Sequence, residues 1–219
     1  LAVILISILV PHYLKKTSQA TKKRFGYVLA YILILNELVK PYYHTQFFGY
    51  DLLNVLPFHM CALSAFSISI FFLTNKRIFY EVAFFWGIGG GLMALLQPDT
   101  PLDFPDPVFI IFFVSHGAMI LAIGHASIAL VNRPNLDSVK RAIMVSLAVI
   151  VMIYFINLIL GPPANFWYLG GRPEGTSIMD LMPAPPRHIP IVVTLGLIMF
   201  SIIYLPYWIY DRLKAKDAG

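Results

Sequence analysis

Long apolar runs separated by short polar segments dominate the pattern of hydrophobic and polar positions along the chain. A run of about 20 apolar residues is the length that a helix needs to cross a hydrocarbon core of about 30 Å. Pro, Gly and charged residues mark the breaks between the runs. The predicted helical spans are 1–13, 27–39, 53–73, 79–96, 108–131, 142–160 and 189–210.

The first of these spans is shorter than a membrane crossing requires, and the sequence does not begin with Met. We therefore expect this span to be incomplete, with further residues before it in the natural protein. The alternative, the apolar stretch of a signal peptide, is disfavoured because no small-residue cleavage site follows the run.

Composition supports a membrane protein rather than a soluble all-α protein. Hydrophobic residues make up 58% of the 219 residues and charged residues 12%, whereas about 25% of an ordinary soluble domain is charged. We therefore predict an all-α, polytopic transmembrane helix bundle in the cell membrane, forming a single integral membrane domain over residues 1–219. The net charge of +5 does not indicate nucleic-acid binding, because cytoplasmic loops of membrane proteins collect Lys and Arg.

Lys and Arg residues are concentrated in alternate loops, and this asymmetry predicts the orientation of the seven spans. Of the 16 Lys and Arg residues, only Lys40, Arg172 and Arg187 lie in the loops that follow spans two, four and six. Because positive residues are enriched on the cytoplasmic side, the N-terminus is predicted to be outside and the C-terminus cytoplasmic. If the first run does not cross the membrane, six spans remain, and each remaining loop keeps the side of the membrane assigned to it above.

Polar residues of the spans and adjoining loops converge on one level in the outer half of the membrane, when depth is counted at about 1.5 Å per residue. They include Glu37, His59, Cys61, Gln97, Asp99, His116, Asn157 and Arg172. Ionisable groups inside a membrane are costly and usually face the bundle interior or a water-filled cavity. Each residue alone is explained by a hydrogen bond to a neighbouring helix, and Lys40 is an alternative partner for Glu37. The convergence nevertheless predicts an outward-facing polar cavity.

The long segment 161–188 follows the sixth span on the outer side and is expected to cover this cavity. Its aromatic residues suit the headgroup interface of a membrane. Arg172 either pairs with a carboxylate of the same segment, Glu174 or Asp180, or holds a phosphate or carboxylate group of a ligand. The alternative for the whole segment is a connector without chemistry.

The glycines of the fourth span and the spacing of the histidines argue against nucleotide and metal sites. The segment "GIGGGLMALL" lacks the preceding strand and the following Lys-Ser/Thr of a phosphate loop. Gly87 and Gly91 are therefore predicted to let a neighbouring helix approach closely. No His-x-x-x-His pair occurs in the sequence, and His116 and His125, nine residues apart, lie on opposite faces of a helix. No cofactor or metal is therefore expected.

The stretch 56–66 places His59 two residues before Cys61, and this single cysteine excludes an internal disulfide. On a continuous helix the two side chains lie about 200° apart and cannot pair with each other. Cys61 then has no activator in its own helix and needs a base from another one to form a thiolate. His116 is the candidate base, although it could equally partner His59. Without an activator Cys61 is a small hydrophobic residue, so His116 is expected to matter more for activity.

Four motifs, in this order and spacing, resemble the YwaF-like family of bacterial integral membrane proteins. The motifs are "NVLPFHMCALSAF", "EVAFFWGIGGGLMALLQPD", "FFVSHGAMIL" and "INLILGPPANFWYLGGRPEGTSIMDLM". That family is similar to eukaryotic transmembrane proteins proposed to be phospholipid acyltransferases with a cysteine nucleophile. The resemblance implies a nucleophilic cysteine at a position that corresponds to either Phe58 or Cys61.

The first hypothesis for function is a lipid-modifying enzyme, specifically an acyltransferase acting on membrane phospholipids. His116 would be its general base and Cys61 its candidate nucleophile. His59 or Asn157 would stabilise the oxyanion. The residues expected to bind substrate are Glu37, Gln97, Asp99, Asn157 and Arg172.

Two alternatives use the same polar residues differently. One is a small-solute or ion transporter, with proton-linked sites at Glu37, His59 and His116. The other is a non-catalytic accessory subunit of a larger membrane complex, in which the polar groups only fix helix packing. The expected partners are membrane lipids and, for the accessory subunit, other membrane protein subunits.

Overall fold

The structure, a computed structural model, describes residues 2–96, 98, 103–172 and 178–217, and within these ranges it contains helices and no strand. The helices are α1 (Ala2–Lys15), α2 (Gln19–Phe48), α3 (Leu52–Val55), α4 (Met60–Thr74), α5 (Arg77–Trp86), η1 (Gly87–Gly91), α6 (Leu92–Leu96), α7 (Pro107–Gly124), η2 (His125–Ala129), α8 (Leu136–Leu160), η3 (Phe166–Tyr168), η4 (Ile178–Leu181) and α9 (Ile189–Asp217). The π-helical segment η1 joins α5 to α6, and the π-helical segment η2 extends α7. The predicted all-α class is confirmed.

Among the described residues, four helical segments are long and apolar enough to cross a membrane: Arg77–Leu96, Pro107–Ala129, Leu136–Leu160 and Ile189–Ala215. They correspond to the last four predicted spans. Two shorter apolar helices, α1 and α4, correspond to the first and third predicted spans. The structure is therefore that of a membrane-type helical protein, whereas the seven crossings, their orientation and the particular membrane stay predictions.

Local sequence signals explain where several helices begin and end. The side chains of Ser18 and Asp106 cap α2 and α7 by accepting hydrogen bonds from backbone N–H groups. Asn135 and Ser138 form a reciprocal capping box at the start of α8. Gly49, with a φ of 71°, ends α2 in the left-handed conformation that glycine adopts without steric cost.

The third predicted span is not one continuous helix, and the prediction is wrong for its first part. α3 ends before Leu56, whose ψ of 146° is extended, and α4 begins three residues after Pro57. Pro57 causes the break, because proline has no N–H to donate and disfavours helical backbone at the residue before it. His59 is consequently the N-cap of α4, and Cys61 lies in the first turn of that helix.

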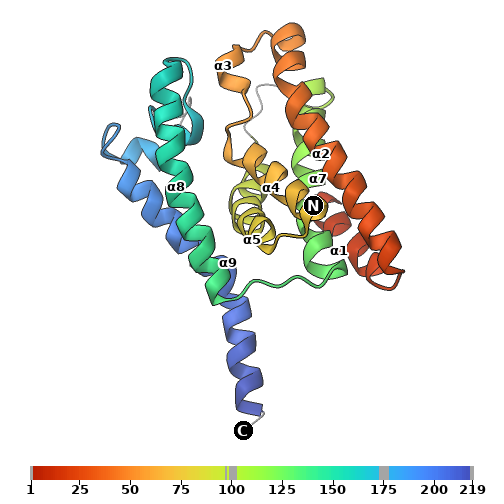
Figure 1. Cartoon of the computed structure of the whole chain (residues 1–219). Helices are drawn as coiled ribbons and strands as arrows, with labels where there is room; N and C mark the ends of the chain where they lie inside the picture. Colours follow the sequence, from red (N-terminus) through yellow and green to blue (C-terminus); the bar gives the residue numbers. More distant parts are fainter. Residues whose placement is uncertain (1, 97, 99–102, 173–177, 218–219) are drawn as a thin grey trace.

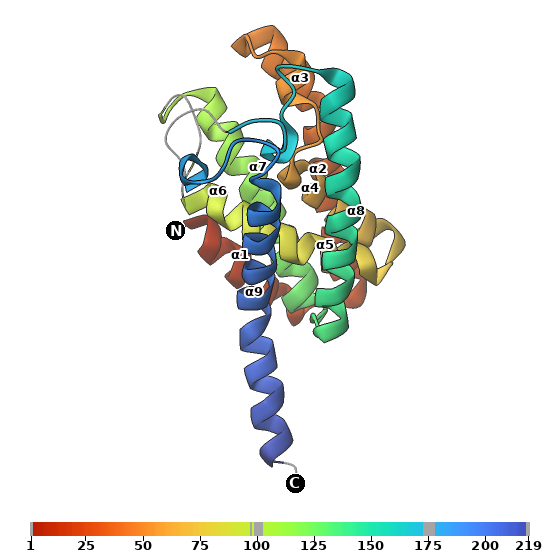
Figure 2. The ribbon, with the colours of Figure 1, turned by 90° about the vertical axis from the view of Figure 1, so that its left-hand side faces the viewer.

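The helices α2, α4, α5 and α7 pack together in the centre of the molecule. α1 packs against α7, while α8 and α9 lie on the opposite side of the bundle (Figure 1, Figure 2). The C-terminal part of α9 projects beyond the other helices (Figure 1). The core where the central helices meet is filled by apolar side chains such as Leu33, Ile68, Phe85 and Ile123.

Close packing in the centre depends on the glycines of η1. A Cβ atom at Gly87 would overlap with Ile123 of α7, and one at Gly91 would overlap with Met119 of the same helix. The predicted close approach at these two glycines is confirmed, because a Cβ atom at either position would force a side chain of α7, Ile123 or Met119, to move.

Candidate functional site

The start of α4 is shaped by its N-cap residue, His59. The His59 side chain makes no capping hydrogen bond, and its Nε2 atom lies 2.7 Å from the carbonyl oxygen of Asn54. Because a carbonyl oxygen only accepts, Nε2 carries the proton and Nδ1 keeps its lone pair. The imidazole ring also packs edge-on against the ring of Phe166, with 4.9 Å between the centroids. Neutral His59 therefore has no second N–H with which to stabilise an oxyanion.

Cys61 is a free, half-buried cysteine in the first turn of α4. The aligned peptide dipoles place about half a positive charge at a helix start, and the first backbone N–H groups have no helical partner. Both features favour a thiolate or another anion at this position. The expectation that Cys61 has no activator in its own helix assumed a helix that runs through His59; the break before His59 removes that assumption, and the state of the thiol stays a prediction.

His116 lies in the middle of α7 and is held through one of its two nitrogens. Its Nδ1 atom is 2.9 Å from the carbonyl oxygen of Phe112, one helical turn earlier, so Nδ1 carries the proton. The two rings are in contact, with 4.2 Å between their centroids. Nε2 is left with a free lone pair, and this is the arrangement that a general base requires.

α2 adds two charged residues, Glu37 and Lys40, which lie on one face because they are three positions apart. Lys40 lies within electrostatic reach of His59, Cys61 and His116. Glu37 also lies within reach of Cys61, where its negative charge opposes the effect of Lys40. Glu37 is only 6% exposed, and the second oxygen of its carboxylate has no hydrogen-bond partner. The structure therefore brings α2, the start of α4 and the middle of α7 together around these groups.

The first part of the predicted covering segment, residues 161–172, is fastened to the segment before α4. The indole Nε1 of Trp167 donates to the carbonyl oxygen of Phe58 at 3.0 Å, and the Phe166 ring contacts the rings of Phe58 and His59. Asn157 holds this segment to α8, because its amide donates to the Phe166 carbonyl and accepts from the Phe166 N–H, both at 2.9 Å. The loop thus reaches the site from the side of α8.

Several residues predicted to bind substrate do not join this group. Both amide atoms of Asn157 are occupied by loop backbone, and Nη2 of Arg172 donates to the carbonyl oxygen of Met182 at 2.5 Å. Gln97 and Asp99 lie outside the described residues. No direct hydrogen bond links one described site residue to another, and no group of three or more His, Cys, Asp or Glu in the described ranges is placed to hold a metal.

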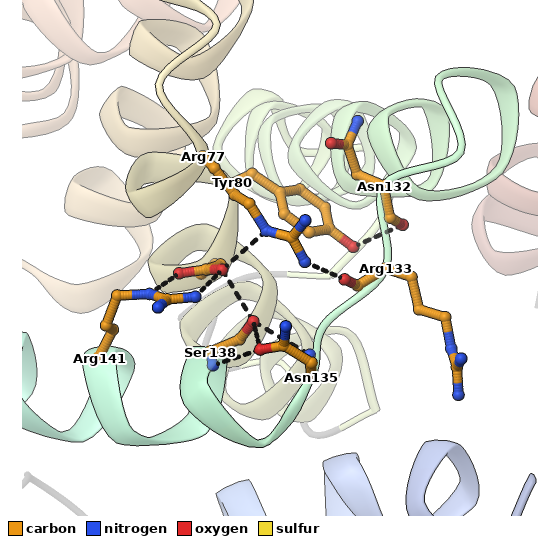
Figure 3. Close-up of polar contacts among 8 residues, drawn as sticks. Arg77, Tyr80, Asn132, Arg133, Asn135, Ser138 and Arg141 are labelled. Atoms are coloured by element: carbon orange, nitrogen blue, oxygen red, sulfur yellow. Dashed lines mark hydrogen bonds and ion pairs between the residues drawn. The ribbon is translucent and has the colours of Figure 1, made fainter. Parts of the chain in front are cut away.

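A second polar cluster, which is not among the predicted site residues, joins α5 to α8 (Figure 3). The Glu81 carboxylate is fully buried. It accepts hydrogen bonds from Nε of Arg77 at 2.9 Å, from Oγ of Ser138 at 2.8 Å and from two nitrogens of Arg141, both at 2.6 Å. With its charge paired and its oxygens occupied, Glu81 ties two helices together rather than offering a ligand site. An acidic residue inside the apolar run 79–96, with an arginine four positions earlier, was the signal for it.

The sequence also contained a signal for the role of Lys40. It is the only Lys or Arg between the second and third predicted spans, on the side where positive residues are scarce. Pairing with Glu37 was the expected alternative, yet no ion pair joins the two residues among the described side chains. Lys40 is thus a cation available to the groups on α4 and α7.

The fold and the site define a helical membrane protein in which the thiol of Cys61 and the imidazole of His116, on two different helices, lie within electrostatic reach of Lys40. Comparison with known proteins agrees with this class. The chain belongs to the TMEM164 family, whose sequence profile matches residues 1–204. The narrower resemblance to YwaF-like proteins stays a prediction.

One relative and one negative result complete the comparison. An uncharacterised protein of Treponema pallidum (strain Nichols) is 26% identical over 154 residues, which cover 70% of this chain and 63% of that protein. The chain therefore spans less than two thirds of the length of this relative. No solved structure matches the chain.

Proposed function

We propose that this TMEM164-family protein is a lipid-directed acyltransferase whose reaction centre lies at the start of α4. The observation that supports the proposal is that Cys61 on α4 and His116 on α7 both lie within electrostatic reach of Lys40 on α2, with Nε2 of His116 left without a hydrogen-bond partner among the described residues. Acyl transfer needs a nucleophile, a base and donors for an oxyanion. Lipids are the proposed substrates because they surround a membrane protein and because of the resemblance to eukaryotic phospholipid acyltransferases.

In the first half-reaction, Nε2 of His116 takes the thiol proton of Cys61, and the thiolate attacks an ester carbonyl of a donor phospholipid. A C–S bond forms while the ester C–O bond breaks, and the leaving lysolipid oxygen takes the proton back from His116. The free N–H groups of the first turn of α4, with the charge of Lys40, stabilise the oxyanion of the tetrahedral intermediate.

In the second half-reaction, the hydroxyl of an acceptor lysolipid gives its proton to His116 and attacks the thioester. The C–S bond breaks, the thiolate of Cys61 takes the proton from His116, and the acyl group leaves in the new phospholipid. Asn157 positions the covering loop in this scheme rather than contacting substrate. Of the residues predicted to bind substrate, Glu37 is the described one that lies beside this site and is assigned the headgroup contact.

Purified protein in vesicles tests this proposal, with an isotope-labelled acyl chain on a donor phospholipid and an unlabelled lysophospholipid as acceptor. His116→Ala is expected to lower the transfer rate by about 10²–10⁴-fold, the usual contribution of a general base. Cys61→Ala and Cys61→Ser are expected to abolish transfer, and mass spectrometry of the native protein should find an acyl group on Cys61. His12→Ala, which changes an exposed histidine of α1, is the matched control. Equal transfer by the two histidine variants would overturn the proposal.

A second candidate function, proton-linked transport, is favoured by the unpaired oxygen of Glu37 in the interior of the bundle. In this case a pH-sensitive dye inside the vesicles would report a substrate-driven proton flux, and Glu37→Gln would remove it. Acyl transfer without any proton flux would decide against the transporter. Proton flux without acyl transfer would decide against the acyltransferase.

A further inference from the structure

An apolar cavity of about 90 Å³ lies where α8 and α9 run side by side with the centre of the bundle. Its walls come from five segments, α4, α5, α8, η3 and α9. The lining residues on which the following argument depends are Met60, Trp86, Ser146, Trp167 and Gly196. The cavity is small, so a long molecule would enter it with one end only.

Every polar side-chain group in the lining already has a partner within the protein. Nε1 of Trp86 donates to Oγ of Ser146 at 2.8 Å, and this hydroxyl donates to the carbonyl oxygen of Ala142 at 2.7 Å. Nε1 of Trp167 donates to the carbonyl oxygen of Phe58 at 3.0 Å. A polar ligand would therefore lose its hydration without finding a partner here. The cavity fits a hydrocarbon chain.

The surroundings of the cavity supply such chains. In α8 and in α9, only 11% of the 18-residue apolar stretch is buried inside the protein. Both helices are therefore expected to face lipid over most of their surface. Gly196 keeps space on the α9 side of the cavity, since a Cβ atom built there has no other atom within 4 Å. A lipid chain therefore has room beside Gly196 at the edge of the cavity.

One wall residue of the cavity lies in the same first turn of α4 as the proposed nucleophile. Met60 forms part of its wall and is the residue directly before Cys61, so the two positions are about 3.8 Å apart along the backbone. We infer that the cavity is the acyl-chain site of this protein. It would hold the carbon atoms nearest the ester group of a phospholipid acyl chain, close to Cys61, while the rest of the acyl chain stays between α8 and α9. This inference rests on the proposed acyl transfer and adds the position of the substrate chain.

Photolabelling tests the inference without any need for turnover. The full chain, as the His116→Ala variant, is placed in phosphatidylcholine vesicles that contain a phospholipid with a diazirine near the carboxyl end of one acyl chain. After irradiation, mass spectrometry is expected to find crosslinks on Met60, Trp86 or Trp167. Gly196→Leu, which fills the open space of the cavity, should lower these crosslinks about tenfold.

Thr194→Leu is the matched control, because Thr194 is exposed on the same helix two residues earlier and does not line the cavity. It should leave the crosslinks unchanged. In the otherwise native protein, Gly196→Leu should reduce transfer of long acyl chains about tenfold and spare short ones.

The two possible failures are distinguishable. Absent crosslinks at Met60, Trp86 and Trp167, or crosslinks that Gly196→Leu does not reduce, would overturn the acyl-chain site even if the native protein transfers acyl groups. Crosslinks that Gly196→Leu removes, in a protein that transfers no acyl group, would leave the lipid site standing and end the proposed reaction.

Discussion

Arg141→Ala is expected to destabilise the protein strongly, because it removes half of the hydrogen bonds to a buried carboxylate. Arg141 contributes two of the four hydrogen bonds that Glu81 accepts, both 2.6 Å long. Removing one partner of a buried ion pair costs about 3–5 kcal/mol. The Arg141 side chain is 44% exposed, so solvent already screens part of the attraction. We therefore expect the low end of this range, about 3 kcal/mol.

For a chain of this length, a loss of about 3 kcal/mol corresponds to a fall in Tm of about 6–12 °C. Thermal unfolding of the detergent-solubilised protein, followed by tryptophan fluorescence, measures this change. Lys140→Ala is the matched control. Both side chains of its ion pair with Asp137 are exposed, Lys140 by 66% and Asp137 by 64%. Such a surface pair contributes about 0–1 kcal/mol. Equal Tm values for the two variants would refute the reasoning, since the Glu81 carboxylate would then be satisfied without Arg141.

Two further predictions concern topology and the covering loop. Cysteines introduced at Lys140 and Ala184, in a Cys61→Ala background, are expected to react with an impermeant thiol reagent from opposite sides of the membrane; labelling of both from one side would contradict the predicted orientation. Asn157→Ala is expected to cost about 2–4 kcal/mol, because the buried N–H and carbonyl groups of Phe166 lose their partners. Limited proteolysis between α8 and α9 should then be faster than in the native protein, and an unchanged cleavage rate would count against this role.

The sequence by itself determined the class of the protein and the approximate positions of most helices. Apolar runs near 20 residues long can only be accommodated in lipid as helices, which satisfy their own backbone hydrogen bonds. For this reason the predicted runs 79–96, 108–131, 142–160 and 189–210 agree with the long apolar helices to within a few residues at most ends. The close approach at Gly87 was predictable for a similar reason, since small residues in apolar helices mark contacts.

The start of α4 was not predictable from the pattern alone. Pro57 is the fifth residue of the span predicted from residue 53, past the first turn in which a helix tolerates proline. A break near Pro57 was therefore predictable, but not that the helix restarts at Met60. The loop that binds Phe58 through Trp167 comes from more than a hundred residues later. Trp167 contacts the extended segment that precedes His59. Because this segment interrupts the predicted helix, Cys61 lies in the first turn of α4 and not in the middle of a longer helix.

Only the tertiary structure decided which polar groups meet. Glu81 and Arg141 are 60 residues apart, and helical periodicity shows which face of a helix is polar but not which neighbour that face meets. The rotation and packing of the helices place Lys40 within electrostatic reach of His116 rather than in an ion pair with Glu37. Which polar side chains of different helices come together depends on the packing of the whole bundle. The distance between two helices is set by how the side chains of several helices fill the space between them.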